Sequence, residues 1–159
     1  MEHTKTQSIP PMRYLRQYAQ ELHEQGLSEW TIFYRLTAEF TGTPYRWGGA
    51  TTEASDCSGT VCAALNALYG RERRVTTDEL FRRFFTMPYT ESESIHALFF
   101  LNKARRAVHV SAYMGNGIYL NESSREPHTC GTPRTYAELC RMYSDFLAVR
   151  RTYRAGAWE

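Results

Sequence analysis

The spacing of the apolar residues changes once along this chain, and that change restricts the fold more than any other feature. As far as residue 85, apolar residues recur every three or four positions, which is typical of helices with one buried face. From residue 97 onwards they form short runs, several of which alternate with polar residues, as half-buried strands do. Helices followed by strands predict an α+β fold with an antiparallel sheet.

Five helices follow from this pattern and from the residues that flank it. Ser28 is an expected N-cap, because its hydroxyl can accept from a free N–H group of the first turn. Gly26 and Gly70 are expected to end helices. A polar, Pro-ended tail is predicted at residues 1–11. The predicted helices cover residues 12–25, 29–40, 57–69, 77 to 84 or 85, and 135–143.

Four strands are predicted in the second half of the chain. Gly115, Asn116 and Gly117 form the expected hairpin turn between the second and third, because glycine and asparagine adopt the left-handed backbone that tight turns require. The predicted strands cover residues 97–101, 107–114, 118–122 and 146–153.

Length and charge fit a single globular domain and disfavour several classes of protein. The 159 residues suffice for one core, and a net charge of +2 with scattered basic residues gives no argument for nucleic acid. No run of about 18 apolar residues occurs, so no membrane span is predicted. Residues 1–11 lack an apolar signal core, so the protein is expected to stay inside the cell or to leave it by a non-standard route, unless its start was trimmed. The oligomeric state stays open.

The four cysteines do not follow the spacing of a zinc site or a CxxC pair, and no cofactor is predicted. A disulfide between Cys130 and Cys140 stays open. A metal site built from Cys57, His109 and Cys130 is disfavoured, because that spacing fits no known geometry.

Cys57 stands where a helix is predicted to begin, between Asp56 and the pair Ser58 and Gly59. A helix N-terminus carries free N–H groups and a partial positive charge, which favour the thiolate form of a cysteine. The small neighbours leave room for a substrate, and the N–H groups could stabilise an oxyanion. Cys57 is therefore the predicted nucleophile, whereas Cys62, inside the same helix, is predicted to be a packed residue.

A thiol nucleophile needs a base, and His109 is the best candidate among five histidines. His3 and His23 are predicted solvent groups, and His96 and His128 have no evident partner. His109 lies in an alternating strand, which puts it on one face with Ser111 and Tyr113. Val108 and Val110 then point to the opposite face and into the core.

Asn121 is the predicted third member of a Cys-His-Asn relay. A hairpin closed by Tyr113 and Gly117 places His109 directly opposite Asn121 on the same face, with a register slip as the open alternative. The amide would hold one ring nitrogen while the other faces the sulfur of Cys57.

These residues resemble the NlpC-type peptidoglycan peptidases, which are papain-like cysteine peptidases of the bacterial cell wall. The resemblance rests on residues 43–49, residues 56–61, and a third block made of residues 109–110, residues 113–117 and Asn121. It covers roughly residues 40–153. One compact domain is expected, with a tail and two helices at residues 1–41 and the catalytic core at residues 42–155. The resemblance implies a nucleophile helix packed on an antiparallel sheet.

The resemblance also implies an activity and a partner. Members hydrolyse amide bonds in peptidoglycan stem peptides, commonly between D-γ-glutamate and a diamino acid, so the expected partner is peptidoglycan or its peptide fragments. By this similarity Cys57 is the nucleophile, His109 is the base and then the acid, and Asn121 orients the histidine.

Further positions match the substrate cleft of the family. Tyr45, Asp56 and Ser58 match positions that line it. Asp56 and Ser58 would hold the free amine of an N-terminal L-alanine if trimmed stems are preferred, because an ammonium needs carboxylate and hydroxyl acceptors. Trp47 is expected to pack beside the loop.

The chain departs from the family pattern at several positions. Asn121 stands where histidine is frequent, and Thr60 stands where leucine is usual. Residues 95–96 replace a Gly-Asp pair and are expected to alter the cleft wall. The two N-terminal helices could cap the cleft or support the sheet.

Several alternatives stay open at this point. The peptidase could remodel the wall, recycle imported fragments, or act as a toxin or phage lysin. An amidase or acyltransferase of the same fold would use the same relay. A non-catalytic wall-binding domain is disfavoured by the intact Cys57, His109 and Asn121.

Overall fold

The computed structural model describes residues 11–159 and contains all five predicted helices. The predicted tail and His3 fall at residues 1–10, outside the described residues, except that Pro11 already begins the first helix. The fourth helix continues as a π-helix, in which the Phe85 N–H donates to the Leu80 carbonyl at 2.8 Å. The helices are α1 (Pro11–Glu24), α2 (Glu29–Ala38), α3 (Cys57–Tyr69), α4 (Thr77–Glu79) with the π-helix η2 (Leu80–Phe84), and α5 (Tyr136–Met142).

The helix ends lie where their capping residues put them. The Ser28 hydroxyl accepts from the Thr31 N–H at 3.3 Å, which confirms Ser28 as the N-cap of α2. Gly70 ends α3 with φ of 69°, the left-handed conformation that glycine adopts without a steric penalty. Thr76 and Thr135 each form a reciprocal capping box with the glutamate three residues later.

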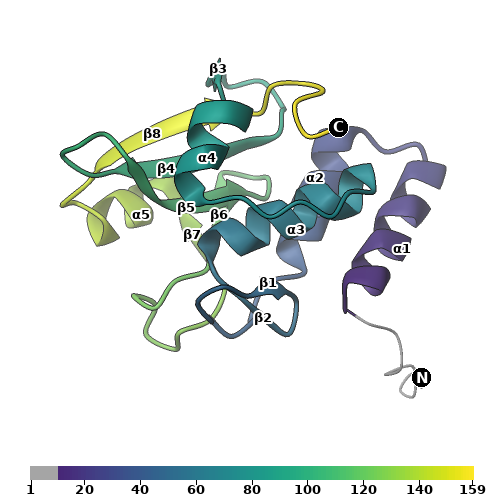
Figure 1. The fold of residues 1–159 in the computed structure, drawn as a ribbon, viewed down its shortest axis with the longest axis horizontal. Coiled ribbons are helices and arrows are strands. Elements are labelled where there is room, and N and C mark those ends of the chain that lie inside the picture. The colour runs from purple at the N-terminus through teal and green to yellow at the C-terminus, as the bar shows by residue number, and fades with distance from the viewer. Residues whose placement is uncertain (1–10) are drawn as a thin grey trace.

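One antiparallel sheet of six strands forms the second half of the molecule, so the α+β prediction is confirmed (Figure 1). Its strand order is β3-β8-β4-β5-β6-β7. The four predicted strands are present as β4 (His96–Leu101), β5 (Ala107–Tyr113), β6 (Ile118–Asn121) and β8 (Leu147–Thr152). The sequence missed the short strands β3 (Met87–Pro88) and β7 (Thr132–Thr135) and the separate hairpin of β1 (Ala50–Thr51) and β2 (Ala54–Ser55). Strands β1, β2 and β3 have two residues each, which is too short for an alternating pattern, and β7 (TPRT) lacks the apolar residues that would mark one.

The register of β5 against β6 differs from the prediction. Tyr113 pairs with Tyr119, so extending the ladder puts Asn121 across from Ser111 and not directly opposite His109. The turn is closed one residue further along, by a 2.9 Å bond from the Met114 N–H to the Ile118 carbonyl. The shift amounts to two residues, and because side chains alternate with a period of two, it leaves His109 and Asn121 on the same face.

A β-bulge corrects a second prediction, on the start of β5. Phe100 pairs with His109 and Leu101 pairs with Ala107, which leaves Val108 as the extra residue. Val108 is 43% exposed, whereas Val110 is buried as expected. The bulge therefore turns Val108 out of the core.

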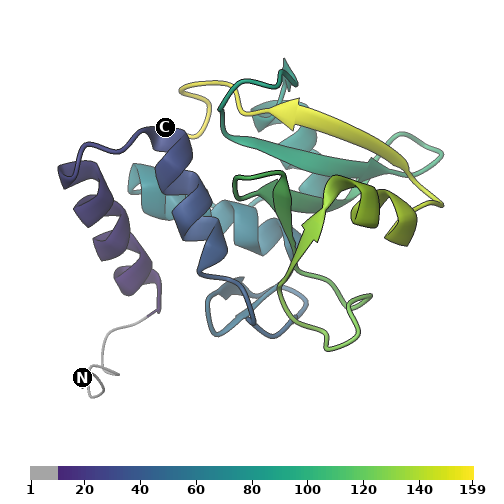
Figure 2. The ribbon, with the colours of Figure 1, turned by 180° about the vertical axis from the view of Figure 1, so that it is seen from behind.

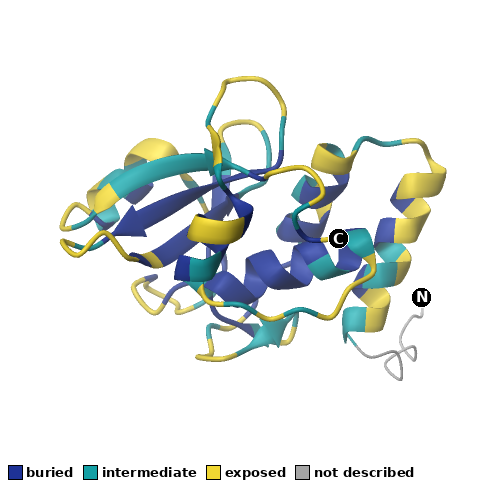
Figure 3. Ribbon diagram, turned by 45° about the horizontal axis from the view of Figure 1, so that its top comes forward, coloured by how far each residue is buried: buried dark blue, intermediate teal, exposed yellow. Residues whose placement is uncertain are grey.

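Helices cover both faces of the sheet (Figures 1 and 2). On one face, α3 and η2 pack with Phe99, Val110 and Leu120 in the larger hydrophobic cluster, which also takes in residues of α1 and α2. On the other face, α5 closes a smaller cluster around Phe100. Strands β4 and β5 and helix α3 are the most deeply buried elements (Figure 3). Helices α1 and α2 contact mainly α3 and little of the sheet, and neither lines the cleft at Cys57 described below.

The C-terminal segment is fixed by Trp158, which is fully buried. Its ring packs edge-on against Phe84 at 4.9 Å between centroids, and its Nε1–H donates to the Asn66 side-chain oxygen at 2.9 Å. A buried aromatic side chain with a satisfied polar atom is a large contribution to the stability of a small domain.

Replacing this tryptophan is expected to destabilise the fold strongly. Trp158→Ala should lower the free energy of unfolding by about 3–5 kcal/mol, because it empties a packed site and removes one of the two hydrogen bonds that the Asn66 side-chain oxygen accepts. Trp47→Ala is the matched control, since Trp47 is 85% exposed, and should change stability by less than about 0.5 kcal/mol. Urea denaturation of both variants measures this. Equal losses of unfolding free energy in the two variants would contradict the packing of Trp158 described here.

Candidate active site

Cys57 is the first residue of α3, and Asp56 is the N-cap that fixes its position. The backbone N–H groups of Cys57 and Ser58 lie in the first turn, where a helix offers no internal acceptor. Gly59 must be glycine, because a Cβ there would collide with the carbonyl oxygen of Gly49. The Gly48-Gly49 turn therefore lies directly against the start of the helix.

The carboxylate of Asp56 already has a full set of donors. One oxygen accepts from the Gly59 N–H at 2.7 Å and the other from the Gly48 N–H at 2.8 Å. The Arg74 guanidinium bonds both oxygens, at 2.9 and 3.0 Å, and its other amino group donates to the Ser58 hydroxyl at 3.0 Å. Asp56 thus organises the helix start, and an incoming ammonium would have to displace Arg74 to reach it.

The surroundings of Cys57 favour its thiolate. Burial raises the pKa of the thiol, but the imidazolium charge of His109, with hydrogen bonds from His109, Thr77 and the Val110 backbone, outweighs burial, so the pKa lies below its ordinary value. The Thr77 hydroxyl lies 3.6 Å from the sulfur. Burial raises the pKa of the thiol of Cys62, which is packed inside α3 as predicted.

His109 is held by its ring stacking and by Asn121. Its ring stacks on Tyr143 with 4.5 Å between centroids. Its Nε2 lies 2.7 Å from the Asn121 side-chain oxygen, a diagonal contact across the two strands. The Ser111 hydroxyl donates to the same oxygen at 2.9 Å.

A buried ion pair continues this chain of contacts beyond Asn121. The amide nitrogen of Asn121 donates to the Glu126 carboxylate at 2.7 Å. Arg134 binds the two oxygens of that carboxylate in a fork, at 2.6 and 3.0 Å. Glu126 is 2% exposed, whereas the Arg134 side chain is 25% exposed, so the carboxylate is shielded from water and the guanidinium reaches the surface.

The direction of these hydrogen bonds determines the tautomer of His109. A carboxylate can only accept, so Glu126 requires the NH2 group of Asn121 on its side. The Asn121 oxygen then faces His109, and Nε2 must carry the hydrogen. Nδ1 is left as the ring nitrogen available to the thiol of Cys57.

Glu122 is a second buried carboxyl next to this network, and both of its oxygens lack a hydrogen-bond partner among residues 11–159. Burial and the negative charges of Asp56 and Cys57 raise its pKa to about 8. At neutral pH it is therefore mostly protonated, which keeps one negative charge away from the thiolate.

Burying Glu122 should make the wild type less stable, relative to Glu122→Gln, as the pH rises. The unfolded carboxyl ionises above about pH 4.5 while the native one keeps its proton until about pH 8, so the native state loses relative stability between these values. Glu122→Gln removes this loss, so its Tm advantage over the wild type should grow across that range and then level off. Glu53→Gln, on an exposed turn, is the control. A Tm difference for Glu122→Gln that does not change with pH would exclude a raised pKa.

A cleft of about 830 Å³ opens above the sulfur. It brings together five of the six predicted site residues, Tyr45, Asp56, Cys57, Ser58 and His109, while Asn121 lies behind His109. Burial and the neighbouring charges of Cys57 and Asp56 raise the pKa of Tyr45. The prediction that Trp47 packs beside the loop is wrong, because it stands 85% exposed at the cleft.

Several residues of the site escaped the sequence reasoning. Arg74, Thr77 and Tyr143 lie 18 to 22 residues from their partners Asp56, Cys57 and Asn121. Glu126 is only five residues from Asn121, but it lies in the loop between β6 and β7, where no periodic pattern links the two residues. His96 was expected to lack a partner and to alter the cleft wall. Instead it bonds the Tyr119 hydroxyl at 2.9 Å and lies away from the cleft.

Other features bear on metal and membrane binding. Cys57, Cys62, Cys130 and Cys140 are all free thiols in the structure. In the described part of the chain, no three His, Cys, Asp or Glu side chains gather as a metal site requires. None of the helices within residues 11–159 has the length and apolar character needed to cross a membrane.

Comparison with known proteins relates this arrangement to one family. A model of the NlpC/P60 family matches residues 42–141, which is more than half of the chain. The probable peptidoglycan endopeptidase LytE of Bacillus subtilis (strain 168) is 32% identical over 84 residues. That match covers 52% of this chain and 24% of LytE, so the chain corresponds to about a quarter of that relative's length.

Solved structures share the fold. NlpC1 from Trichomonas vaginalis superposes with a TM-score of 0.57 at 18% identity, over 76% of this chain and 42% of that one. The peptidoglycan hydrolase RipB from Mycobacterium tuberculosis gives a TM-score of 0.60 at 17% identity, over 95% of this chain and 85% of that one. At these identities the likeness concerns the fold.

Proposed function

The chain belongs to the NlpC/P60 family, and we propose that it is a cysteine peptidase that hydrolyses amide bonds in peptidoglycan stem peptides. The bond proposed is the one between D-γ-glutamate and a diamino acid. One observation carries the proposal: a thiol with a lowered pKa at a helix N-terminus, beside a histidine whose Nε2 is held 2.7 Å from an asparagine oxygen.

The proposed mechanism uses the tautomer that the network favours. Nδ1 of His109 takes the proton of Cys57, and the sulfur attacks the carbonyl carbon. The N–H groups of Cys57 and Ser58 stabilise the oxyanion. His109 then donates its proton to the leaving amine, and an acyl-enzyme remains on the sulfur. Water, deprotonated by His109, releases the acid and restores the thiol.

Asp56 was expected to bind the free amine of an N-terminal L-alanine, but its carboxylate is already occupied. Arg74 saturates that carboxylate, so we propose that Asp56 serves to fix the start of α3 and that a free N-terminal amine is not required. The Arg74 side chain is 38% exposed at the cleft and presents a positive charge there. A carboxylate of the stem peptide fits this charge better than an ammonium does.

The activity is tested directly with a defined tripeptide. L-Ala-γ-D-Glu-diaminopimelate, its N-acetylated form and whole peptidoglycan are incubated with the wild type and with Cys57→Ala, and products are identified by mass spectrometry. The wild type should release diaminopimelate from both tripeptides, and Cys57→Ala should release none. Cys62→Ala is the matched control, because that thiol is packed inside α3, and should retain activity.

Each other outcome has a defined meaning for the proposal. Cleavage of the polymer alone would keep the peptidase and reject short stems as substrates. Cleavage of the free tripeptide alone would restore the amine-binding role of Asp56 and Ser58. A new amide or ester formed with an added amine or alcohol would indicate an acyltransferase. No cleavage of any substrate would reject the proposed peptidase.

Glu126 is proposed as a positioning residue that keeps Asn121 in its active orientation. Glu126→Gln can donate where the carboxylate only accepted, so the Asn121 amide is free to turn and His109 loses its fixed tautomer. We expect kcat to fall about 10–100-fold with KM nearly unchanged. Alkylation of Cys57 by iodoacetamide should also become slower at mildly acidic pH, because less thiolate is present.

A double-mutant cycle separates positioning from general destabilisation. If Glu126 acts through Asn121, the double variant Glu126→Gln/Asn121→Ala should lose no more activity than Asn121→Ala alone. Additive losses, or an unchanged alkylation profile, would show that Glu126 has only a structural role.

A further inference from the structure

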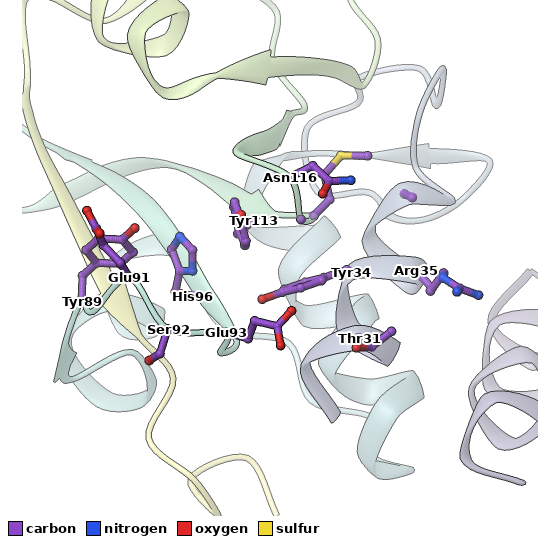
Figure 4. A pocket seen from close by; sticks show the side chains of 13 residues that line it. Thr31, Tyr34, Arg35, Tyr89, Glu91, Ser92, Glu93, His96, Tyr113 and Asn116 are labelled. Carbon is purple, nitrogen blue, oxygen red and sulfur yellow. The ribbon is translucent and has the colours of Figure 1, made fainter. Parts of the chain in front are cut away.

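A second cavity of about 350 Å³ lies between α2, the segment at residues 89–93, and the β5–β6 hairpin (Figure 4). It shares no lining residue with the cleft at Cys57. Tyr113, which lines it, follows His109 by four residues on β5, which is about 13 Å in strand geometry. The two sites are therefore separate enough to be occupied independently.

Aromatic rings form the walls of this cavity, and their hydroxyl groups are already used. Tyr34 and Tyr113 meet edge to face, with 5.2 Å between centroids. The Tyr34 hydroxyl donates to the Ser94 carbonyl at 2.8 Å, and the Tyr113 hydroxyl accepts from the Gly117 N–H at 2.9 Å. The rings are thus fixed in place, and their carbon surfaces remain for a ligand.

One side chain that lines the cavity carries an unpaired buried atom. His96 is 3% exposed and its Nδ1 has no hydrogen-bond partner within the described residues. Figure 4 shows the His96 ring between those of Tyr89 and Tyr113. Burial and the charge of Arg150 lower the pKa of His96 to about 4, although a contact with the Ser94 backbone opposes this shift, so the ring is neutral. Buried polar atoms such as this Nδ1 normally pair with water or a ligand.

The rim carries both hydrogen-bond donors and acceptors. Glu91, Glu93, Arg35 and Asn116 are exposed there, and none forms a side-chain hydrogen bond or ion pair within residues 11–159. A cation would use the two carboxylates and the amide oxygen of Asn116 but not Arg35, and an anion would use only the guanidinium and amide nitrogens. Hydroxyl groups, which donate and accept, can use all four.

We propose that this cavity binds one ring of an N-acetylated amino sugar. The C–H face of a pyranose packs on an aromatic ring, its hydroxyl groups pair with the mixed rim, and its amide N–H supplies the partner that Nδ1 of His96 lacks. The proposal rests on the cavity and not on peptidase activity. If the proposed function holds, the sugar belongs to the glycan strand that carries the stem peptides.

The test measures sugar binding without turnover. N-acetylglucosamine oligomers are titrated into isotope-labelled Cys57→Ala and followed by amide NMR. Saturable shifts should appear in α2, residues 89–96 and the β5–β6 hairpin. Glu93→Gln and Arg35→Ala, both exposed changes that leave the fold intact, should each weaken binding about fivefold. Glu53→Gln and Arg141→Ala, exposed elsewhere, are the matched controls and should not change it.

Other outcomes decide the ligand and its source. No saturable shift, or shifts equally affected by the controls, would overturn the proposal, as would binding of diaminopimelate or lysine in place of the sugar. Binding of wall glycan strands stripped of their peptides assigns the polymer as the source. If free oligomers bind but the stripped glycan strands do not, the sugar site is supported and its ligand is a soluble saccharide. Because Cys57→Ala cannot turn over, the result is independent of whether the peptidase proposal holds.

Discussion

The carboxylate of Asp56 holds together the three segments from which the cleft is built. It caps α3 through Gly59, fixes the glycine turn through Gly48 and anchors the segment after α3 through Arg74. Thr60 adds to this arrangement, because its hydroxyl bonds the Asp56 carbonyl and the Ser55 hydroxyl at 3.0 Å each. Thr60 thus has a role in hydrogen bonding that a leucine at this position would lack. Cys57 follows Asp56 directly, so any motion of this cap would move the sulfur.

Local signals in the sequence were enough to predict most elements of the fold. Ser28 and Gly70 bound their helices through contacts with residues at most four positions away, and such contacts can be read from a single sequence. The hairpin turn is equally local. Its register could still be misjudged by two residues, because Gly115, Asn116 and Gly117 all have positive φ and allow more than one closure.

What escaped prediction depends on contacts between distant residues. Arg74 is 18 residues from Asp56, and the bulge at Val108 arises only when β5 pairs with β4. Trp47 resembles a core residue by its type alone, but a core residue needs surrounding side chains, and the glycine turn next to it supplies none. The candidate triad could be predicted because Cys57 stands at a predicted helix start and His109 and Asn121 fall on one face of a predicted hairpin. The residues that orient it could not.

Two buried glutamates four residues apart, Glu122 and Glu126, differ in their electrostatic surroundings. Glu126 forms an ion pair with Arg134, and this pair fixes the amide of Asn121 and hence the tautomer of His109. Glu122 has no counter-ion within residues 11–159, and its pKa rises to about 8. Ionised, it would oppose the thiolate that His109 stabilises, so its protonation favours the same charge distribution that Glu126 orients. An asparagine in the third relay position suits this arrangement. Its NH2 group donates to Glu126, which turns its oxygen toward His109. Because the amide is neutral, it adds no charge between the ion pair and the catalytic histidine.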